Sequence, residues 1–237
     1  MRKIFKIILK IVGALLVLFA IIGVVLYIIY NQPLPEGKSG QEAEALAEKM
    51  VNAINFEAYQ NTQFLDWSFN NGAHTYTWDK TNGKVIVKWS DYLVNLNLND
   101  NSKSIVLKNN NQLSNEEGKA IIKTARDYFN NDSFWLVAPF KVLDQGTKRS
   151  IVELDDGTKG LMVTYSTGGS TPGDSYLWKL QDNGFPISYQ MWVSIIPIGG
   201  IEASWDDWQI MESGVFLPTT HKLGPITLDM GTVKAYN

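Results

Sequence analysis

The feature that most constrains this 237-residue chain is an uncharged apolar run near its beginning, from Ile11 to Tyr30. An α-helix rises about 1.5 Å per residue, so roughly 20 residues cross a hydrocarbon core of about 30 Å. A cleavable signal peptide has a shorter apolar core, about 7–15 residues, followed by small residues at the cleavage site. This run ends in Tyr-Ile-Ile-Tyr-Asn-Gln-Pro. We therefore predict an uncleaved transmembrane anchor, with a long signal peptide as the alternative.

The charges predict the orientation of this anchor. Four basic residues and no acidic residue precede or flank it, namely Arg2, Lys3, Lys6 and Lys10. Lys and Arg beside a span stay in the cytoplasm. We expect a single-pass protein of the bacterial cytoplasmic membrane, with its N-terminus in the cytoplasm and its body in the periplasm or outside the cell. The first 35 residues carry +4 and the whole chain −3, so the body carries −7, which argues against nucleic-acid binding.

The chain divides into three parts on this basis. Residues 1–30 form the basic end and the anchor, residues 31–40 form a short linker with two prolines and two glycines, and residues 41–237 form one extracytoplasmic domain. The chain contains no cysteine. This excludes disulfides, thiolate metal sites, a cysteine nucleophile and a lipid-bearing cysteine.

The stretch from Gly160 to Trp192 predicts an antiparallel meander. Large apolar side chains alternate with their neighbours, the period-2 pattern of strands, in three sets: Leu161, Val163 and Tyr165; Tyr176, Trp178 and Leu180; Tyr189, Met191 and Val193. Asp182-Asn183-Gly184 supplies a tight reversal, because Asn and Gly tolerate positive φ. A similar meander is expected from about 55 to 109, with a hairpin turn at Asn82-Gly83. The pattern indicates a curved sheet around apolar space.

Two helices are predicted, each starting at a capping box. Ser39 with Glu42, and Ser114 with Glu117, have the spacing at which two side chains satisfy free backbone N–H groups. Apolar stripes follow them, over about 43–54 and 115–130. The next segment, 134–140, is continuously apolar and is expected to be a buried plug too short for a helix. The predicted fold is α+β: an N-terminal transmembrane helix followed by an incomplete antiparallel β-barrel, or curved sheet, with two helices packed on its concave face.

Signals for chemistry are weak, and we predict no enzyme, no catalytic residue, no metal site and no cofactor. The chain has two histidines, His74 and His221, both expected at the surface. Asp206 and Asp207 are adjacent and would point to opposite faces of a strand, so they are not an acid/base pair. The glycine-rich segment 168–174 lacks the following helix that phosphate sites use, and predicts a hairpin loop at the barrel mouth.

Eight tryptophans are the residues best suited to a binding surface. Trp and Tyr carry a large apolar area with a polar tip, so they can line a groove for an apolar or sugar ligand or fill an ordinary core. Both interpretations stay open. If there is a pocket, the candidate lining residues are the large apolar side chains of the strands and the plug, namely Trp89, Trp135, Met162, Trp178 and Met191.

The order of elements, with the segments Asn131–Phe140 and Tyr176–Pro186, resembles the LolA/LolB-like superfamily of periplasmic lipoprotein carriers and related lipid-binding proteins, especially the branch in bacteroidete-type bacteria. The resemblance implies an incomplete barrel whose helices cover a pocket for acyl chains. LolA-like carriers are released soluble and LolB-like receptors have an acylated cysteine, and this chain has an apparent anchor and no cysteine. The resemblance therefore favours lipid binding over lipoprotein sorting.

Three functions follow from these observations. The first is a membrane-anchored extracytoplasmic protein that binds lipid or another apolar ligand, in envelope lipid or lipoprotein handling. The second is an envelope scaffold or partner-binding module with a filled core, which a packed interior would favour. The least favoured is a glycan hydrolase using Glu202, Asp206 or Asp207, because it needs two carboxylates about 5–10 Å apart in one cleft.

Overall fold

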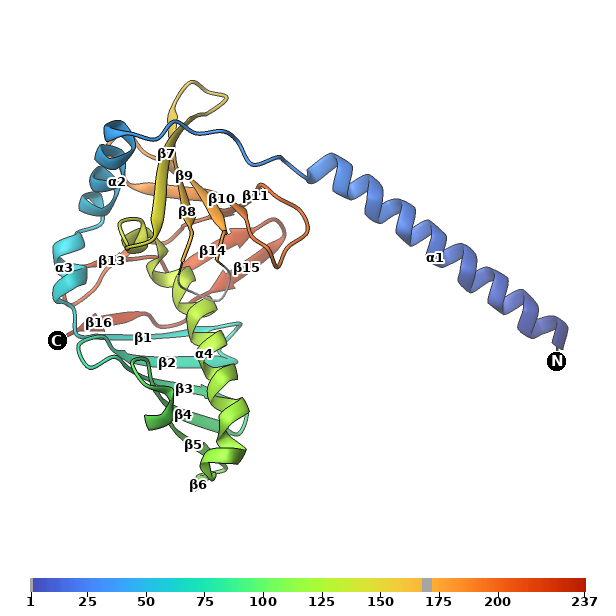
Figure 1. Ribbon diagram of the computed structural model, residues 1–237, viewed down its shortest axis with the longest axis horizontal. Coiled ribbons are helices and arrows are strands. Elements are labelled where there is room, and N and C mark those ends of the chain that lie inside the picture. The colour runs from blue at the N-terminus through green and yellow to red at the C-terminus, as the bar shows by residue number, and fades with distance from the viewer. Residues whose placement is uncertain (1, 168–171) are drawn as a thin grey trace.

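The computed structural model describes residues 2–167 and 172–237 of the chain, with side chains from Ile4 onward. The first element, α1 (Arg2–Tyr30), projects away from the folded body as a single long helix (Figure 1). Within the described residues, one helical segment is long and apolar enough to cross a membrane, Ile4–Tyr30, and none of it is buried against the body.

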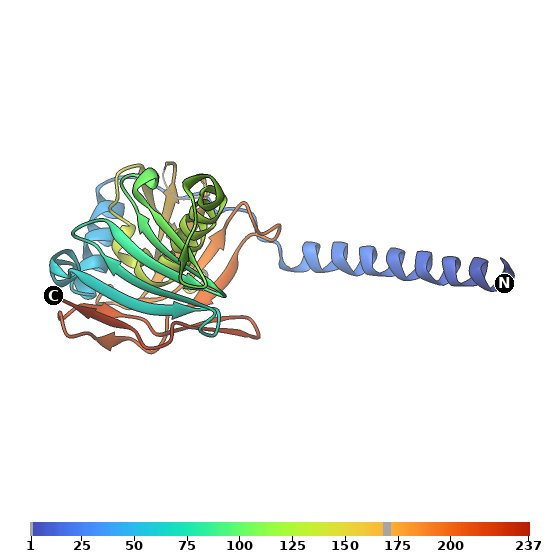
Figure 2. The same cartoon turned by 90° about the horizontal axis from the view of Figure 1, so that it is seen from below.

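In the described part of the body there are three further α-helices and two short 3₁₀ turns. These are α2 (Gln41–Ala53), α3 (Phe56–Asn61), η1 (Asn101–Lys103), α4 (Asn115–Val137) and η2 (Ala138–Lys141). The long helix α4 runs along one face of the first group of strands and ends beneath the second (Figures 1 and 2). It therefore connects the two halves of the core.

Most strands belong to two antiparallel sheets. The seven-stranded sheet has the order β16-β1-β2-β3-β4-β5-β6, formed by β1 (Phe64–Phe69), β2 (His74–Asp79), β3 (Lys84–Trp89), β4 (Tyr92–Asn97), β5 (Ile105–Lys108), β6 (Asn111–Gln112) and β16 (Lys234–Tyr236). The five-stranded sheet has the order β11-β10-β9-β8-β7, formed by β7 (Thr147–Glu153), β8 (Lys159–Tyr165), β9 (Ser175–Leu180), β10 (Pro186–Trp192) and β11 (Ile201–Ser204). Two small ribbons complete the strands: β12 (Gln209–Ile210) with β13 (Phe216–Leu217), and β14 (Thr220–Leu223) with β15 (Ile226–Asp229).

The predicted α+β class and the antiparallel strands are confirmed, and the predicted single curved sheet is not. The sheets are separate and do not close into a barrel, and α4 and η2 lie between β6 and β7 in the chain. The two predicted hairpin turns are confirmed, at Asn82-Gly83 between β2 and β3 and at Asn183-Gly184 between β9 and β10, with positive φ at each glycine.

The helix starts differ from each other. Ser114 forms the predicted capping box with Glu117, whose carboxylate accepts from the Ser114 backbone N–H across 3.1 Å. At the start of α2 the N-cap is Gly40, with no side-chain hydrogen bond, so the capping box predicted for Ser39 is wrong. The predicted plug is also wrong in part, because α4 continues through it to Val137. Burial of that last turn against the core outweighs the weak helix propensity of the preceding asparagines.

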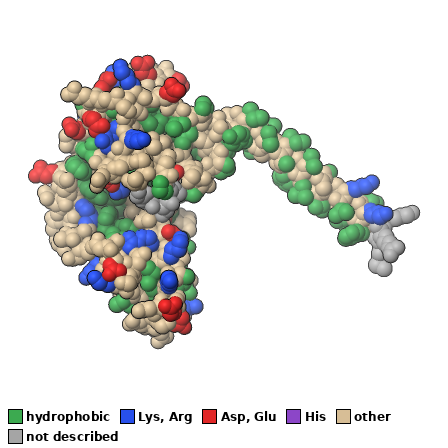
Figure 3. Space-filling view, in the orientation of Figure 1, with side chains coloured by type: hydrophobic (Ala, Val, Ile, Leu, Met, Phe, Trp, Pro, Cys, Tyr) green, Lys and Arg blue, Asp and Glu red, His purple; other side chains and the backbone are tan. Residues whose placement is uncertain are grey.

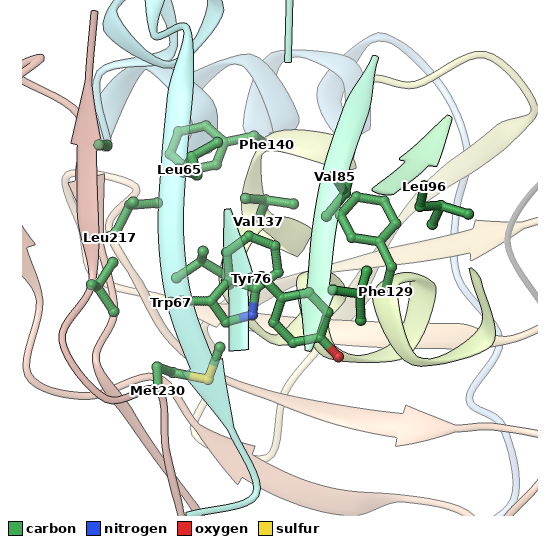
Figure 4. Packing of buried hydrophobic residues seen from close by; sticks show 14 of the residues in the cluster. Leu65, Trp67, Tyr76, Val85, Leu96, Phe129, Val137, Phe140, Leu217 and Met230 are labelled. Atoms are coloured by element: carbon green, nitrogen blue, oxygen red, sulfur yellow. The ribbon is translucent and has the colours of Figure 1, made fainter. Parts of the chain in front are cut away.

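The core has one large cluster on the inner face of each sheet. Under the seven-stranded sheet, Trp67 stacks on Tyr76 with ring centroids 4.5 Å apart (Figure 4). Phe129 of α4 packs edge-on against Trp78. Under the five-stranded sheet, the side chains of β8 to β11 pack against α2 and the end of α4. A third, small cluster lies on the opposite face of the five-stranded sheet, formed by Val152, Met162 and Leu177.

Candidate functional site

The structure separates the five residues predicted to line a pocket. Trp135, Trp178 and Met191 pack together on the inner face of the five-stranded sheet. Trp89 belongs to the cluster of the other sheet, and Met162 lies on the opposite face of its own sheet. The position of Met162 follows from strand alternation, because its neighbours Leu161 and Val163 point to the inner face.

The inner face of the five-stranded sheet is occupied by aromatic rings, which we call the aromatic cluster: Trp135, Trp178, Tyr189, Trp205 and His221. Trp178 and Tyr189 are 0 % exposed and meet at right angles, with centroids 5.0 Å apart. Trp205 lies 5.0 Å from Trp178 and 5.6 Å from Tyr189. Interlocked side chains therefore occupy this face, where the sequence left both a ligand groove and a filled core open.

Several buried polar atoms on this face have no hydrogen-bond partner among the described residues. They are the indole N–H groups of Trp178 and Trp205, the hydroxyls of Tyr165 and Tyr189, and Nε2 of His221. Burial raises the pKa of Tyr189 well above its usual value, so its hydroxyl stays protonated. An unpaired buried polar group costs about 1–3 kcal/mol, and in native proteins such groups are usually satisfied by protein, ordered water or ligand.

His221 lies inside the aromatic cluster, whereas the sequence predicted a surface histidine. Its side chain is 0 % exposed, its ring lies 4.5 Å from that of Trp205, and Nδ1 donates to the Ser204 carbonyl across 2.9 Å. Burial lowers the pKa of His221 to about 4, and the backbone groups of Ser204 and Trp135 offset this only in part. The imidazole is therefore neutral at neutral pH.

The second histidine belongs to a polar network between α4 and the seven-stranded sheet. Asp132 is 1 % exposed, and its Oδ2 accepts from the Tyr76 hydroxyl across 2.5 Å and from His74 Nδ1 across 2.7 Å. The Asn131 amide donates to the other carboxylate oxygen, and Tyr128 stacks on the His74 ring. Burial, with the adjacent Asp132, raises the pKa of Tyr76. The sequence reasoning missed Asp132 because it ended the helix at Asn130.

This network is half of a general-base arrangement, in which a carboxylate orients an imidazole. The His74 side chain is 14 % exposed, and no Ser or Thr hydroxyl is bonded to it in the described part of the chain. Residues 2–167 and 172–237 also contain no group of three or more His, Asp or Glu side chains placed to hold a metal ion. The geometry shows a paired buried carboxylate that joins helix to sheet.

The remaining predicted candidates do not converge. Asp206 and Asp207 have separate partners, since Asp206 accepts from the Ser204 hydroxyl and Asp207 from the Thr220 hydroxyl. Residues 168–171 of the glycine-rich segment lie outside the described residues. We predicted that Asp206 and Asp207 form no acid/base pair and that segment 168–174 forms no phosphate site. Both statements stay predictions.

The outer face of the seven-stranded sheet carries a groove of about 420 Å³. A cross-strand row runs along its floor, in which Ile86 lies opposite Thr77 and Asn95, and Asn95 lies opposite Ile105. Phe64 and Lys84 line its sides. Ile86 and Ile105 are 37 % and 43 % exposed, so the groove combines open apolar surface with amide, hydroxyl and ammonium groups.

The linker is bound to the body along the outer face of the five-stranded sheet. The backbones of Lys38 and Ile151 exchange two hydrogen bonds, of 2.8 and 2.9 Å. Nearer to α1, the Gln32 N–H donates to the Gly199 carbonyl, and the Trp192 indole donates to the Gln32 carbonyl across 2.8 Å. The linker therefore crosses the sheet as a fixed strap (Figure 1), beside a second groove of about 470 Å³ that includes Pro33.

Comparisons with known proteins add no assignment. No family model matches this chain, and no curated protein matches it. The resemblance to the LolA/LolB-like superfamily accordingly stays a prediction, and the function has to be argued from the geometry above.

Proposed function

We propose that this protein is a membrane-tethered binding module that engages an extracytoplasmic partner through its outer surfaces. The observation that carries this proposal is the filled interior. Trp178, Tyr189 and Trp205 interlock on the inner face of the five-stranded sheet, where a carrier would hold an acyl chain. The two grooves described above lie on the outer faces of the two sheets.

The tether is supported by the surface of α1. From Ile4 to Tyr30 its side chains are exposed and mostly apolar, and basic residues mark the end far from the body (Figure 3). Exposing that much apolar surface to water is unfavourable, and a bilayer removes the cost. With the basic end in the cytoplasm, the body lies on the extracytoplasmic side.

The groove on the seven-stranded sheet is the best candidate for the partner surface. Ile86 and Ile105 are neighbours across β4, and polar side chains of the same row surround them. Contiguous exposed apolar surface with a polar rim is typical of protein contacts. We infer an envelope protein as the partner, bound against this row.

A second candidate function is supported by the unpaired polar groups on the inner face of the five-stranded sheet. Two hydroxyls and two indole N–H groups without partners would be satisfied by an amphipathic ligand whose apolar part replaces some of the ring contacts. This is a form of the lipid-binding hypothesis. It requires α2 or the end of α4 to move, since both cover the cluster.

One experiment separates the two candidates. α1 contributes no buried residue to the body, so a fragment of residues 31–237 retains the linker bonds and both cores. Native mass spectrometry of this fragment, expressed in the bacterial periplasm, should give the apo mass, and added phospholipid should not raise its melting temperature. A mass increment released on denaturation, together with a stabilising shift, would instead establish the second function.

The partner surface is tested separately in membranes. A photocrosslinking residue at Ile105 should form a discrete adduct with another protein. The matched control is Ile226 on β15, which is similarly exposed and lies outside the groove. Equal adducts at both positions, or none at Ile105, would refute the assignment of the groove.

A further inference from the structure

The loop between β10 and β11, residues 193–200, is unusually apolar for a surface loop. It reads Val-Ser-Ile-Ile-Pro-Ile-Gly-Gly and lies in a stretch without charged residues, from Asn183 to Ile201. Ile195 at its tip is 70 % exposed, the largest exposed fraction of any large apolar side chain described outside α1. Covering this side chain would remove its apolar area from water, which is favourable.

The same loop is bonded to the residues that immediately follow α1. Asn31 and Gln32 come directly after Tyr30, where the helix ends. The Asn31 side chain accepts from the Gly199 N–H across 2.8 Å, and the Gln32 N–H donates to the Gly199 carbonyl across 3.0 Å. The loop thus lies beside the point where the chain leaves α1 (Figure 2).

The two glycines of the loop allow this close approach. A Cβ added at Gly200, whose φ is +79°, would lie 2.7 Å from the Cβ of Gln32. A Cβ at Gly199 would lie 2.9 Å from the Gln32 carbonyl oxygen. Contacts this short are incompatible with a side chain, so both positions require glycine for the linker to lie against the loop.

We propose that loop 193–200 inserts into the outer headgroup boundary of the bilayer that α1 spans, and so seats the body on the lipid surface. This inference rests on the proposed tether. If Tyr30 ends the span, Tyr27 and Tyr30 lie at the headgroup level where aromatic residues are enriched. The hydrogen bonds that join Asn31 and Gln32 to Gly199 then hold the loop at the same level.

A bilayer fits this surface better than a protein partner does. The loop is continuous with the membrane span through short hydrogen bonds, whereas the groove proposed for a protein partner is on the other sheet. Leu34 in the linker is also half exposed, which extends the apolar surface around the end of α1. The body is acidic, with a charge of −7, so the uncharged loop is the part that approaches anionic lipid without repulsion.

The absence of native cysteine allows a direct test with single-cysteine probes. The full chain is reconstituted in phosphatidylethanolamine–phosphatidylglycerol vesicles, with an environment-sensitive fluorophore on Ile195→Cys. Lipids carrying a nitroxide on the acyl chain should quench this probe several-fold more than the same probe on Ile105→Cys or Ile226→Cys. Those two controls are exposed isoleucines far from the loop in sequence, and they measure insertion caused by the dye alone.

A probe on Phe19→Cys, within the apolar run, reports the tether itself. Quenching at positions 19 and 195, with the two controls unquenched, supports insertion of loop 193–200 into the bilayer. Quenching at position 19 without quenching at 195 refutes insertion of the loop and still supports α1 as the membrane anchor. No quenching at position 19 overturns the tether and the seat with it. Quenching at 195 equal to that of the controls also overturns the seat, because the dye then explains the signal.

Discussion

The indole N–H of Trp192 donates a hydrogen bond to the backbone carbonyl of Gln32 across 2.8 Å, joining β10 to the linker over 160 positions of sequence. The bond makes the linker part of the folded body. A linker rich in proline and glycine would otherwise act as a free spacer. The point at which the chain leaves α1 is consequently joined to the five-stranded sheet.

Trp192→Phe removes this bond while keeping an aromatic ring over the sheet. We expect the free energy of unfolding of the 31–237 fragment to fall by about 0.5–1.5 kcal/mol, and limited proteolysis in residues 31–38 to accelerate. The matched control is Trp208→Phe, since the Trp208 indole donates to the Trp205 carbonyl, away from the linker. Equal cleavage of the linker in both variants would contradict the role given to Trp192.

Asp132→Asn should weaken the junction between α4 and the seven-stranded sheet. The substitution removes a carboxylate that accepts from His74, Tyr76 and Asn131, and hydrogen bonds to charged groups contribute about 1.5–3 kcal/mol each. Urea unfolding should show a loss of at least that size. Tyr76→Phe alone should cost less, and the double variant should cost less than the sum of the two, because both remove the same bond.

The pH dependence of stability should report His221. Its pKa is lowered to about 4 in the folded protein against an ordinary 6.5, so the unfolded chain binds more protons between these values. Stability from this group is complete above pH 6.5 and is lost as the pH falls towards 4, by up to about 3 kcal/mol. NMR titration of the imidazole gives the pKa directly. A midpoint near 6.5 would mean that the ring is solvated.

Tyr189→Phe distinguishes a dry core from an occupied one. The Tyr189 hydroxyl is buried and lacks a partner among the described residues, so its removal should be neutral or stabilising in the filled-core proposal. Tyr76→Phe is the matched control, because that hydroxyl is paired with Asp132 and its loss should destabilise. A destabilisation by Tyr189→Phe as large as that of the control would indicate a water or ligand at the hydroxyl.

Local patterns in the sequence predicted the local structure well. Tyr176 and Trp178, like Tyr189 and Met191, are two positions apart in a strand. This spacing correctly predicted that all four side chains lie on one face. The capping box at Ser114 was right because its two side chains act within a single turn. The same pattern at Ser39 failed, because the helix starts at Gln41 while Lys38 pairs with β7.

Contacts between distant segments were not predictable in the same way. Asp132 meets His74 only because α4 lies across β2, and neither residue carries a local signal for the other. The division into two sheets likewise depends on how α4 packs, which periodicity does not specify. Strand alternation alone is enough to exclude Met162 from the predicted pocket. Its neighbours Leu161 and Val163 point to the inner face, so Met162 points to the outer face.

Strand β16 pairs with β1, so that Ala235 lies opposite Leu65. During synthesis β1 emerges long before β16, and until then it has an exposed, hydrogen-bonding edge next to a growing apolar core. With the body on the extracytoplasmic side, copies that emerge side by side from the membrane pair through that edge, which makes the interval before β16 emerges the stage most vulnerable to aggregation.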